Sequence, residues 1–390
     1  MTPPTNLEDR AASPRRSHRR RARAVAGWLA LGLAAATGLA ACSSSSSTAS
    51  TSTTTSTAST SGGSTSSTQA STAASTAKVP LVVYAAEGYD ATVCAAFQKA
   101  TGIPTKLEDN STGTLLAQIS AERNNPQWGV FWSDGDESYA ALDLQGYLVR
   151  GFLPSTGTLN SLGTSLVPKD RAWVPTGVTI AGAIVYNSKV VSDPPTSWTQ
   201  LLEPKWKGAV GMNNPALSGP TYPFVAGMMH MLGGVSAGER FFTEMKANGL
   251  HVFPTNKVTL TALLNGTIKL AIVQNSAGLG FAFKAPALRV AYPSKVTVLP
   301  SVIGIDAKVS PTEIAEAKRF ASFVYSPAGQ AAMLAGDPHG DSLFVPIVEG
   351  TVAHAAVPPL SSLPVQVLNP YTWGAREATV NSWFTNNIIN

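Results

Sequence analysis

The 390-residue chain has a formal net charge of +5, with 28 lysines and arginines against 23 aspartates and glutamates. The excess lies in the first 41 residues. From Lys78 onward acidic and basic residues balance, so charge gives no indication of a nucleic-acid partner. Cys94 is the only cysteine beyond Cys42, which excludes an intramolecular disulfide there, and the five histidines are too scattered for a metal-ligand spacing.

The first 41 residues have the composition of a targeting segment. Arginines up to Arg23 precede an almost uninterrupted apolar stretch at 24–41, as in a signal peptide or a membrane span. The stretch Leu39-Ala40-Ala41-Cys42 resembles the lipobox of bacterial lipoproteins, which implies cleavage before Cys42 and acylation of its thiol. We therefore expect a lipoprotein signal peptide over 1–41, with a retained membrane helix as the alternative.

Residues 42–77 are expected to form the lipidated cysteine and a linker. After Cys42 this segment contains only Ser, Thr, Ala, Gly and Gln. Such a composition cannot bury enough apolar surface to offset the entropy of the chain, so we expect a disordered tether.

From Lys78 onward the pattern alternates between strands and helices. We expect strands at 81–86, 105–108 and 127–132, and helices at 90–100, directly after Asn110 and at 137–147. This order predicts a parallel sheet covered by helices, in which ligands bind at the carboxyl ends of the strands. The loops 86–89, 109–113 and 133–136 would converge there. A body of about three hundred residues is too long for one simple core and suggests two lobes.

Further along, the chain shows elements suited to a second lobe and a return to the first. We expect a strand pair at 174–187 that crosses between lobes, a helical hairpin at 222–249, a short helix at 260–266, and strands at 270–276 and 296–305. Ser310 and Pro311 predict the start of a helix that runs over 314–325. We expect the residues after it to cover the first lobe.

One helix start is unusually rich in hydroxyl groups. Asn110 or Ser111 can cap the helix, and Thr112, Gly113 and Thr114 crowd its first turn. Gly113 would let a ligand approach the backbone, and the free N–H groups and the helix dipole favour an anion or a polar oxygen. The alternative is an ordinary helix cap with spare hydroxyls in solvent.

The order of several short motifs resembles the extracellular solute-binding proteins of ABC importers, in the two-lobed group that includes ferric, phosphonate and sugar-phosphate binders. The matching stretches extend over about 79–346. They are V-V-Y-A-A-E, F-Q-K-A-T-G-I, S-T-G-T-L-L-A-Q-I, G-V-F-W-S-D-G, A-I-V-Y-N, the run from Pro194 through Trp198 and Trp206-Lys207-Gly208, and E-A-K-R-F-A-S-F-V-Y-S-P-A-G-Q.

A second hydroxyl-rich helix start occurs in this resemblance region. Ser218 or Gly219 lies near the cap, and Pro220 or Thr221 starts the helix. Two such helix starts on opposite lobes could grip one anionic group from both sides, although plain capping remains the alternative.

The resemblance implies an α/β protein with the type 2 periplasmic-binding-protein fold, in which two mixed-sheet lobes are joined by a two-segment hinge. It implies a first lobe at 78–177, a second lobe at 178–297, and a return to the first lobe with a C-terminal tail at 298–390. Together with the helix starts it gives the candidate ligand-binding residues Ala86, Glu87, Ser111, Thr112, Gly113, Ser133, Asp134, Thr176, Asn214, Ser218, Gly219, Thr221, Asn275, Ser276 and Tyr292.

Other functions are weighed against this one. Ferric members of the group carry adjacent tyrosines shortly after the strand at 270–276, and this chain has no Tyr-Tyr pair, which argues against a ferric role. Gly234-Val235-Ser236-Ala237-Gly238 matches a hydrolase motif but follows a helix instead of a strand. Asp134, Asp136 and Glu137 could act as acid and base, form a solvated loop, or hold the ammonium of an aminophosphonate.

The resemblance therefore implies a lipid-anchored receptor that is not an enzyme and needs no cofactor. It would close on a small polar or anionic solute such as a phosphonate or a sugar phosphate, and deliver it to an ABC permease. We expect a monomer on the extracytoplasmic face of the membrane, without a nucleic-acid partner or a bound metal. A ferric receptor of the same group and a lipid-anchored hydrolase are the alternatives.

Overall fold

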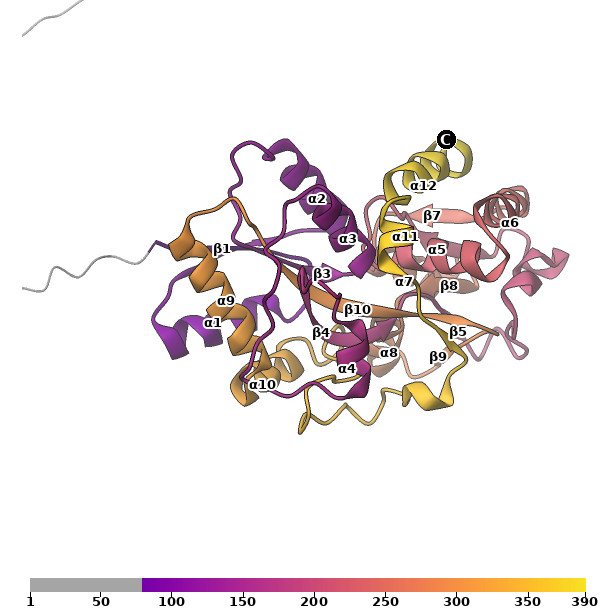
Figure 1. Cartoon of the computed structure of the whole chain (residues 1–390). Coiled ribbons are helices and arrows are strands. Elements are labelled where there is room, and N and C mark those ends of the chain that lie inside the picture. The colour runs from indigo at the N-terminus through magenta and orange to yellow at the C-terminus, as the bar shows by residue number, and fades with distance from the viewer. Residues whose placement is uncertain (1–78) are drawn as a thin grey trace, which may run out of the picture. The chain divides into compact units, whose positions relative to one another are not determined.

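A computed structural model of the protein describes residues 79–390 (Figure 1). The expectations for the signal peptide, for Cys42 and for the linker lie outside the described residues. No helix among the described residues is both long and apolar enough to span a bilayer.

Two mixed sheets form the framework. The first contains β1 (Leu81–Ala85), β2 (Thr105–Asp109), β3 (Val130–Asp134), β4 (Trp173–Ile180), β10 (Val296–Ile305) and β11 (Val365–Gln366). The second contains β5 (Ala183–Asn187), β6 (Val210–Asn213), β7 (His251–Phe253), β8 (Leu270–Val273) and β9 (Leu288–Ala291).

The helices of the first lobe are α1 (Asp90–Thr101), α2 (Thr112–Ala121), α3 (Asp136–Leu144), α4 (Ser161–Leu166), α9 (Pro311–Tyr325) and α10 (Pro327–Gly336). Those of the second lobe are α5 (Thr221–Met231), α6 (Val235–Ala247), α7 (Asn256–Leu264) and α8 (Asn275–Lys284). The chain ends with α11 (Pro370–Gly374) and α12 (Glu377–Phe384).

In the first lobe β1 pairs in parallel with both β2 and β3, as the strand–helix alternation predicts. Their carboxyl ends therefore lie at one edge, which brings the residues after β1, β2 and β3 together. β10 runs antiparallel to β3 and to β4, so the sheet is mixed. In the second lobe β6 and β8 are parallel, and β8 pairs antiparallel with β5.

Two segments connect the lobes. The chain leaves the first sheet at the end of β4 and enters the second sheet at β5, with only residues 181–182 between them. It returns through residues 292–295, which join β9 to β10. The paired strands β4 and β10 form the bridge next to these crossings.

The C-terminal segment corrects one expectation. Residues up to Val348, and Tyr371, pack on the first lobe as expected, but Leu368, Trp373, Val380, Phe384 and Ile388 are buried in the main core cluster of the second lobe. Figure 1 shows α12 beside α5 and α6. The physical reason is an apolar face on α12, from which Phe384 makes a ring contact with Phe242 of α6.

Most predicted helices and strands are confirmed, with shifted ends. The strand expected at 127–132 is β3 at Val130–Asp134, and the helix expected at 260–266 begins earlier, at Asn256, because Thr255 caps it. The strand expected at 270–276 stops at Val273, so that Asn275 and Ser276 form the first turn of α8. The hydrolase-type motif lies at the start of α6, after helix α5, where no nucleophile turn exists.

Candidate functional site

A cavity of about 290 Å³ lies between the lobes, at the carboxyl ends of the first-lobe strands. The first lobe contributes lining residues from the ends of β1, β2 and β3, and the second lobe contributes them from the loops before α5 and α7 and from the end of β8. The lining residues are Ala86, Glu87, Gly88, Asp109, Asn110, Ser111, Thr112, Asp134, Leu217, Ser218, Gly219, Pro220, Thr255, Asn256, Lys257, Gln274 and Asp341.

Two carboxyl groups of this cavity come from neighbouring strand ends. Glu87 follows β1 and is 3% exposed, and Asp134 ends β3 and is 5% exposed. The Ser301 hydroxyl on β10 donates to Glu87 Oε1 over 2.6 Å, and Gln274 Nε2 donates to Asp134 Oδ2 over 2.7 Å. Both side chains are therefore held in place by hydrogen bonds to neighbouring elements.

A third carboxyl group comes from the loop after α10. The backbone N–H of Gly88 donates to Asp341 Oδ2 over 2.9 Å, and the Ser276 hydroxyl donates to Asp341 Oδ1 over 3.3 Å. Asp341 thus joins the loop after β1 to the start of α8, which belongs to the other lobe.

Burial raises the pKa of all three carboxyl groups, and the charges of nearby carboxylates add to the shift. Burial, followed by the charges of Asp134 and Asp341, raises the pKa of Glu87 well above its ordinary value. Burial and the charge of Asp341 do the same to the pKa of Asp134, against the hydrogen bond from Gln274. Burial raises the pKa of Asp341 to about 6. The cavity therefore favours neutral carboxyl groups when it holds no cation.

The lobes touch directly beside the cavity. The hydrogen bond from Gln274 to Asp134 joins β8 to β3, and the backbone N–H of Gly113 donates to the Leu217 carbonyl over 3.2 Å. A Cβ atom on Gly113 would collide with the Ala216 carbonyl, and a Cβ atom on Gly219 would collide with the Thr112 side chain. The structure is therefore a closed arrangement of the two lobes.

The helix start at 111–114 has the predicted cap. The Ser111 side chain accepts from the backbone N–H of Thr114, and it lines the cavity with Thr112. Gly113 does not line this cavity. Its backbone is approached by residues 216–217 of the other lobe, so the close approach that we expected from a ligand is made by the protein.

The second helix start also reaches the cavity. Ser218 and Gly219 line it, and Asn213 Nδ2 donates to the Ser218 hydroxyl oxygen over 3.1 Å. That hydroxyl can still donate its own proton. Thr221 begins α5 and is buried, and no side chain caps this helix.

Several predicted residues do not line the cavity and make contacts within the protein. Ser133 bonds with the Tyr139 hydroxyl, Asn214 accepts from the N–H of Ala216, and Asn275 accepts from the N–H of Ile180. Asn275 Nδ2 also donates to the Tyr292 hydroxyl, and Thr176 accepts from Trp132 Nε1 and donates to Ser301. Asn275 and Tyr292 thus stabilise the two crossings between the lobes.

Sequence reasoning missed several cavity residues, among them Asp341, Gln274 and Lys257. Gln274 directly follows a strand end of the second lobe, which is the same signal that identified Asp134 in the first. Asp341 lies in the loop after α10 and Lys257 in the first turn of α7, and no motif marks either position. Asp136 and Glu137 begin α3 and do not line the cavity, so Asp134 alone of that acidic run does.

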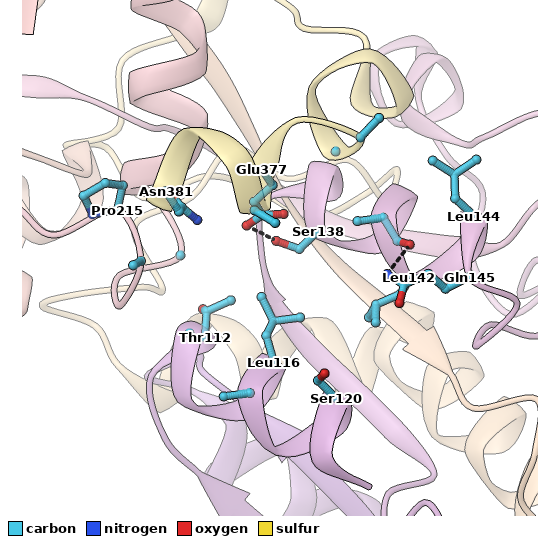
Figure 2. Close-up of a pocket in the computed structure, with 18 of the residues that line it drawn as sticks. Thr112, Leu116, Ser120, Ser138, Leu142, Leu144, Gln145, Pro215, Glu377 and Asn381 are labelled. Atoms are coloured by element: carbon cyan, nitrogen blue, oxygen red, sulfur yellow. Dashed lines mark hydrogen bonds between the residues drawn. The ribbon is translucent and has the colours of Figure 1, made fainter. Parts of the chain in front are cut away.

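A larger cavity of about 670 Å³ lies beside the first and is shown in Figure 2. It is lined mainly by apolar residues of α2, α3 and the C-terminal helices, among them Leu116, Leu142 and Leu144. Thr112, Ser218 and Gly219 border both cavities. We take the smaller cavity as the ligand site because the buried polar groups converge there.

Among residues 79–390 no group of three or more His, Cys, Asp or Glu side chains is arranged to hold a metal ion. Glu87, Asp134 and Asp341 are therefore not arranged as a metal-binding group.

Residues 92–357 of this chain match the sequence profile of the family of bacterial extracellular solute-binding proteins. A Salmonella paratyphi A protein, provisionally described as a 2-aminoethylphosphonate-binding periplasmic protein, is 25% identical over 60% of this chain and 68% of its own length. The major ferric iron-binding protein of Neisseria meningitidis serogroup B is 28% identical over 66% of this chain and 80% of its own length.

Solved structures share the fold. AfuA from Actinobacillus pleuropneumoniae, with fructose-6-phosphate bound, superposes with a TM-score of 0.70 at 17% identity, over 80% of this chain and 98% of that chain. Iron-bound HitA from Pseudomonas aeruginosa superposes with a TM-score of 0.65 at 23% identity, over 78% and 98%.

Proposed function

Because the chain belongs to the family of bacterial extracellular solute-binding proteins, we propose that it captures a small polar solute in the cavity of about 290 Å³ by closing its two lobes, and passes the solute to an ABC permease. The observation that carries this proposal is the cavity itself. Polar side chains from both lobes converge there, and hydrogen bonds between the lobes close it.

One relative is described as a 2-aminoethylphosphonate-binding protein, and one similar structure contains fructose-6-phosphate. Phosphonates and sugar phosphates are therefore the solute classes that we propose. Two features support a negatively charged group on the solute. Ser111 caps α2 at the cavity, and Ser218 keeps a hydroxyl proton to donate on the opposite wall. Free N–H groups at a helix start attract anions.

Removing either the Ser111 or the Ser218 hydroxyl tests whether it binds the negatively charged group of the solute. A lost hydrogen bond to a charged group costs about 1.5–3 kcal/mol, or about ten- to a hundredfold in dissociation constant. Ser111→Ala and Ser218→Ala should each weaken binding of 2-aminoethylphosphonate in calorimetry, whereas Ser165→Ala, at an exposed position that does not line the cavity, should not. Unchanged binding in both cavity variants would make these serines plain structural caps.

Ferric iron is the second candidate, because one relative is named as a ferric iron-binding protein. We propose an organic solute in its place. The chain has no tyrosine pair, and the Tyr292 hydroxyl is bonded to Asn275 away from the cavity. Purified protein mixed with ferric citrate should develop no visible phenolate-to-iron band. A stoichiometric purple-red complex would establish the ferric function instead.

The proposed activity is binding, with no chemical step on the solute. The mechanism needs only lobe closure, which replaces water around the solute with hydrogen bonds from both lobes. Binding should raise the unfolding midpoint by mass action, and the solute should be recovered unchanged after incubation. Recovery of a hydrolysed product would support the alternative of a lipid-anchored hydrolase.

Membership of the family places the protein outside the cytoplasm. We propose in addition that it is a monomer anchored to the membrane by a lipid on Cys42. The motif Leu39-Ala40-Ala41-Cys42 supports the anchor. Cys42→Ala should block labelling with a palmitate analogue and leave the precursor uncleaved, whereas Cys94→Ala should still be labelled. Labelled Cys42→Ala protein would refute the anchor.

A further inference from the structure

The solute cavity has an uncompensated acidic wall. Glu87, Asp134 and Asp341 reach it from three separate segments of the first lobe. Among the described residues, no lysine, arginine or histidine forms an ion pair with any of the three. The one basic side chain in the lining is Lys257, which is exposed at the second-lobe side.

Asp134 presents an acceptor oxygen to the cavity. It is 5% exposed, lines the cavity, and receives a hydrogen bond at Oδ2 from Gln274. Among the described residues, its Oδ1 neither accepts a hydrogen bond from the protein nor belongs to the buried side-chain atoms that lack a partner, so this oxygen is accessible to a solute. A carboxylate oxygen accepts hydrogen bonds, so a donor on the solute can bind there.

The free-energy cost of burying these carboxyl groups without a counter-charge indicates a positive charge on the solute. A buried carboxylate without a counter-charge is costly and remains stable only as a neutral acid or beside a cation. We propose that the solute carries a protonated amine, which donates to Asp134 and lies against Glu87 and Asp341. This inference rests on the proposed function, because it takes the same cavity as the binding site.

An ammonium group fits this wall better than a metal ion. It has three N–H donors, and it needs acceptors on different sides in place of a compact shell of ligands. The described carboxyl groups do not form a metal-binding group, and the Gln274 side chain presents its N–H₂ to Asp134. The acidic wall and the two helix starts lie in one cavity, so the solute class is a small amine with a polar or anionic group at its other end.

Matched pairs of solutes test the amine. 2-Aminoethylphosphonate is compared with ethylphosphonate, and glucosamine 6-phosphate with glucose 6-phosphate, by thermal shift and calorimetry on the purified protein. We expect the amine-bearing solute of each pair to bind. Ethylphosphonate and glucose 6-phosphate should bind at least tenfold more weakly than their amine-bearing counterparts. Binding also converts neutral carboxyl groups to carboxylates, so calorimetry in buffers of different ionisation enthalpy should detect proton release.

Variants then assign the amine to this wall. Asp134→Asn and Glu87→Gln keep the shape of the side chains but remove the charge, and each should weaken amine binding about 10- to 100-fold. The control is Asp193→Asn, whose side chain is 88% exposed and which should bind as the parent does. An unfolding midpoint at or above that of the parent shows that the cavity variants are folded.

The outcomes separate the two proposals. Equal or tighter binding of ethylphosphonate or glucose 6-phosphate overturns the amine and leaves the receptor function intact. Unchanged amine binding by Asp134→Asn and Glu87→Gln also overturns this assignment. Absence of a shift with all four solutes counts against the proposed phosphonate and sugar-phosphate function itself.

Discussion

Gly113 illustrates how a single residue can hold the lobes together. It lies in the first turn of α2, and its N–H donates across to the Leu217 carbonyl of the second lobe. A Cβ atom there would collide with the backbone of residues 216–217. Backbone cannot move aside as a flexible side chain can, so a methyl group at this position should force the lobes apart.

We therefore predict that Gly113→Ala opens the protein without unfolding it. Alanine favours the helix over glycine by about 0.5–1 kcal/mol, so the unfolding midpoint should stay or rise. The radius of gyration from solution scattering should increase, and binding should weaken by tenfold or more, which corresponds to about 1.4 kcal/mol of lost closure. Ser120→Ala, at an exposed position farther along α2 that does not line the ligand cavity, is the control. An unchanged radius with unchanged affinity would show that the contact does not set closure.

The same residue shows how far sequence reasoning reaches at the site. The pattern around Ser111 predicts a helix cap, and the structure confirms it, because capping is a local property of a few consecutive residues. What approaches Gly113 depends on a segment a hundred residues away, which no local pattern reveals. Asp341 was not predicted as a site residue for the same reason, since only the tertiary fold brings its loop against Gly88.

At the scale of elements, the C-terminal helix α12 belongs to the second lobe. Phe384 is fully buried and packs against Phe242 of α6, whereas Ile389 is 37% exposed. Strands and helices with a regular apolar period were predictable, because the period follows from the geometry of one element. The lobe against which the tail packs was not, because an apolar helix face carries no information about its partner.

The placement of α12 makes a stability prediction. Phe384→Ala should lower the free energy of unfolding by about 3–5 kcal/mol, because it removes a large buried side chain and leaves a cavity in the second-lobe core. Ile389→Ala should change it by no more than about 0.5 kcal/mol. Chemical denaturation followed by fluorescence measures both. If the two variants unfolded at the same denaturant concentration, the C-terminal helix would not be part of this core.

At the scale of the whole molecule, most buried carboxyl groups of residues 79–390 form no ion pair. Burial raises the pKa of Asp90, Asp136 and Glu377 to about 7 each, and that of Asp341 to about 6. Asp143 is the opposite case. Burial alone would raise its pKa, but hydrogen bonds from Arg150 and Tyr371 outweigh burial and lower it. A raised pKa means that the folded protein binds protons more tightly than the unfolded chain does.

The sign of the pH dependence follows from these groups. A carboxyl group with a raised pKa stabilises the fold below its ordinary pKa near 4, and this stabilisation is lost as the pH rises through 6 to 7. Asp143 acts in the other direction, since its contribution is lost only when the pH falls below its ordinary pKa. The ligand-free protein should therefore be more stable near pH 5 than at pH 8.

We predict that the unfolding midpoint of the ligand-free protein falls between pH 5 and pH 8. A loss of about 1 kcal/mol would correspond to about 2–4 °C, measured by scanning calorimetry. Glu377→Gln should reduce the fall, because glutamine can still accept the 2.9 Å hydrogen bond from Ser138 without becoming charged beside Glu137. Lys246→Gln, on the exposed surface, should leave the slope unchanged. A midpoint that rises steadily toward pH 8 would mean that these carboxyl groups ionise in the folded protein without cost.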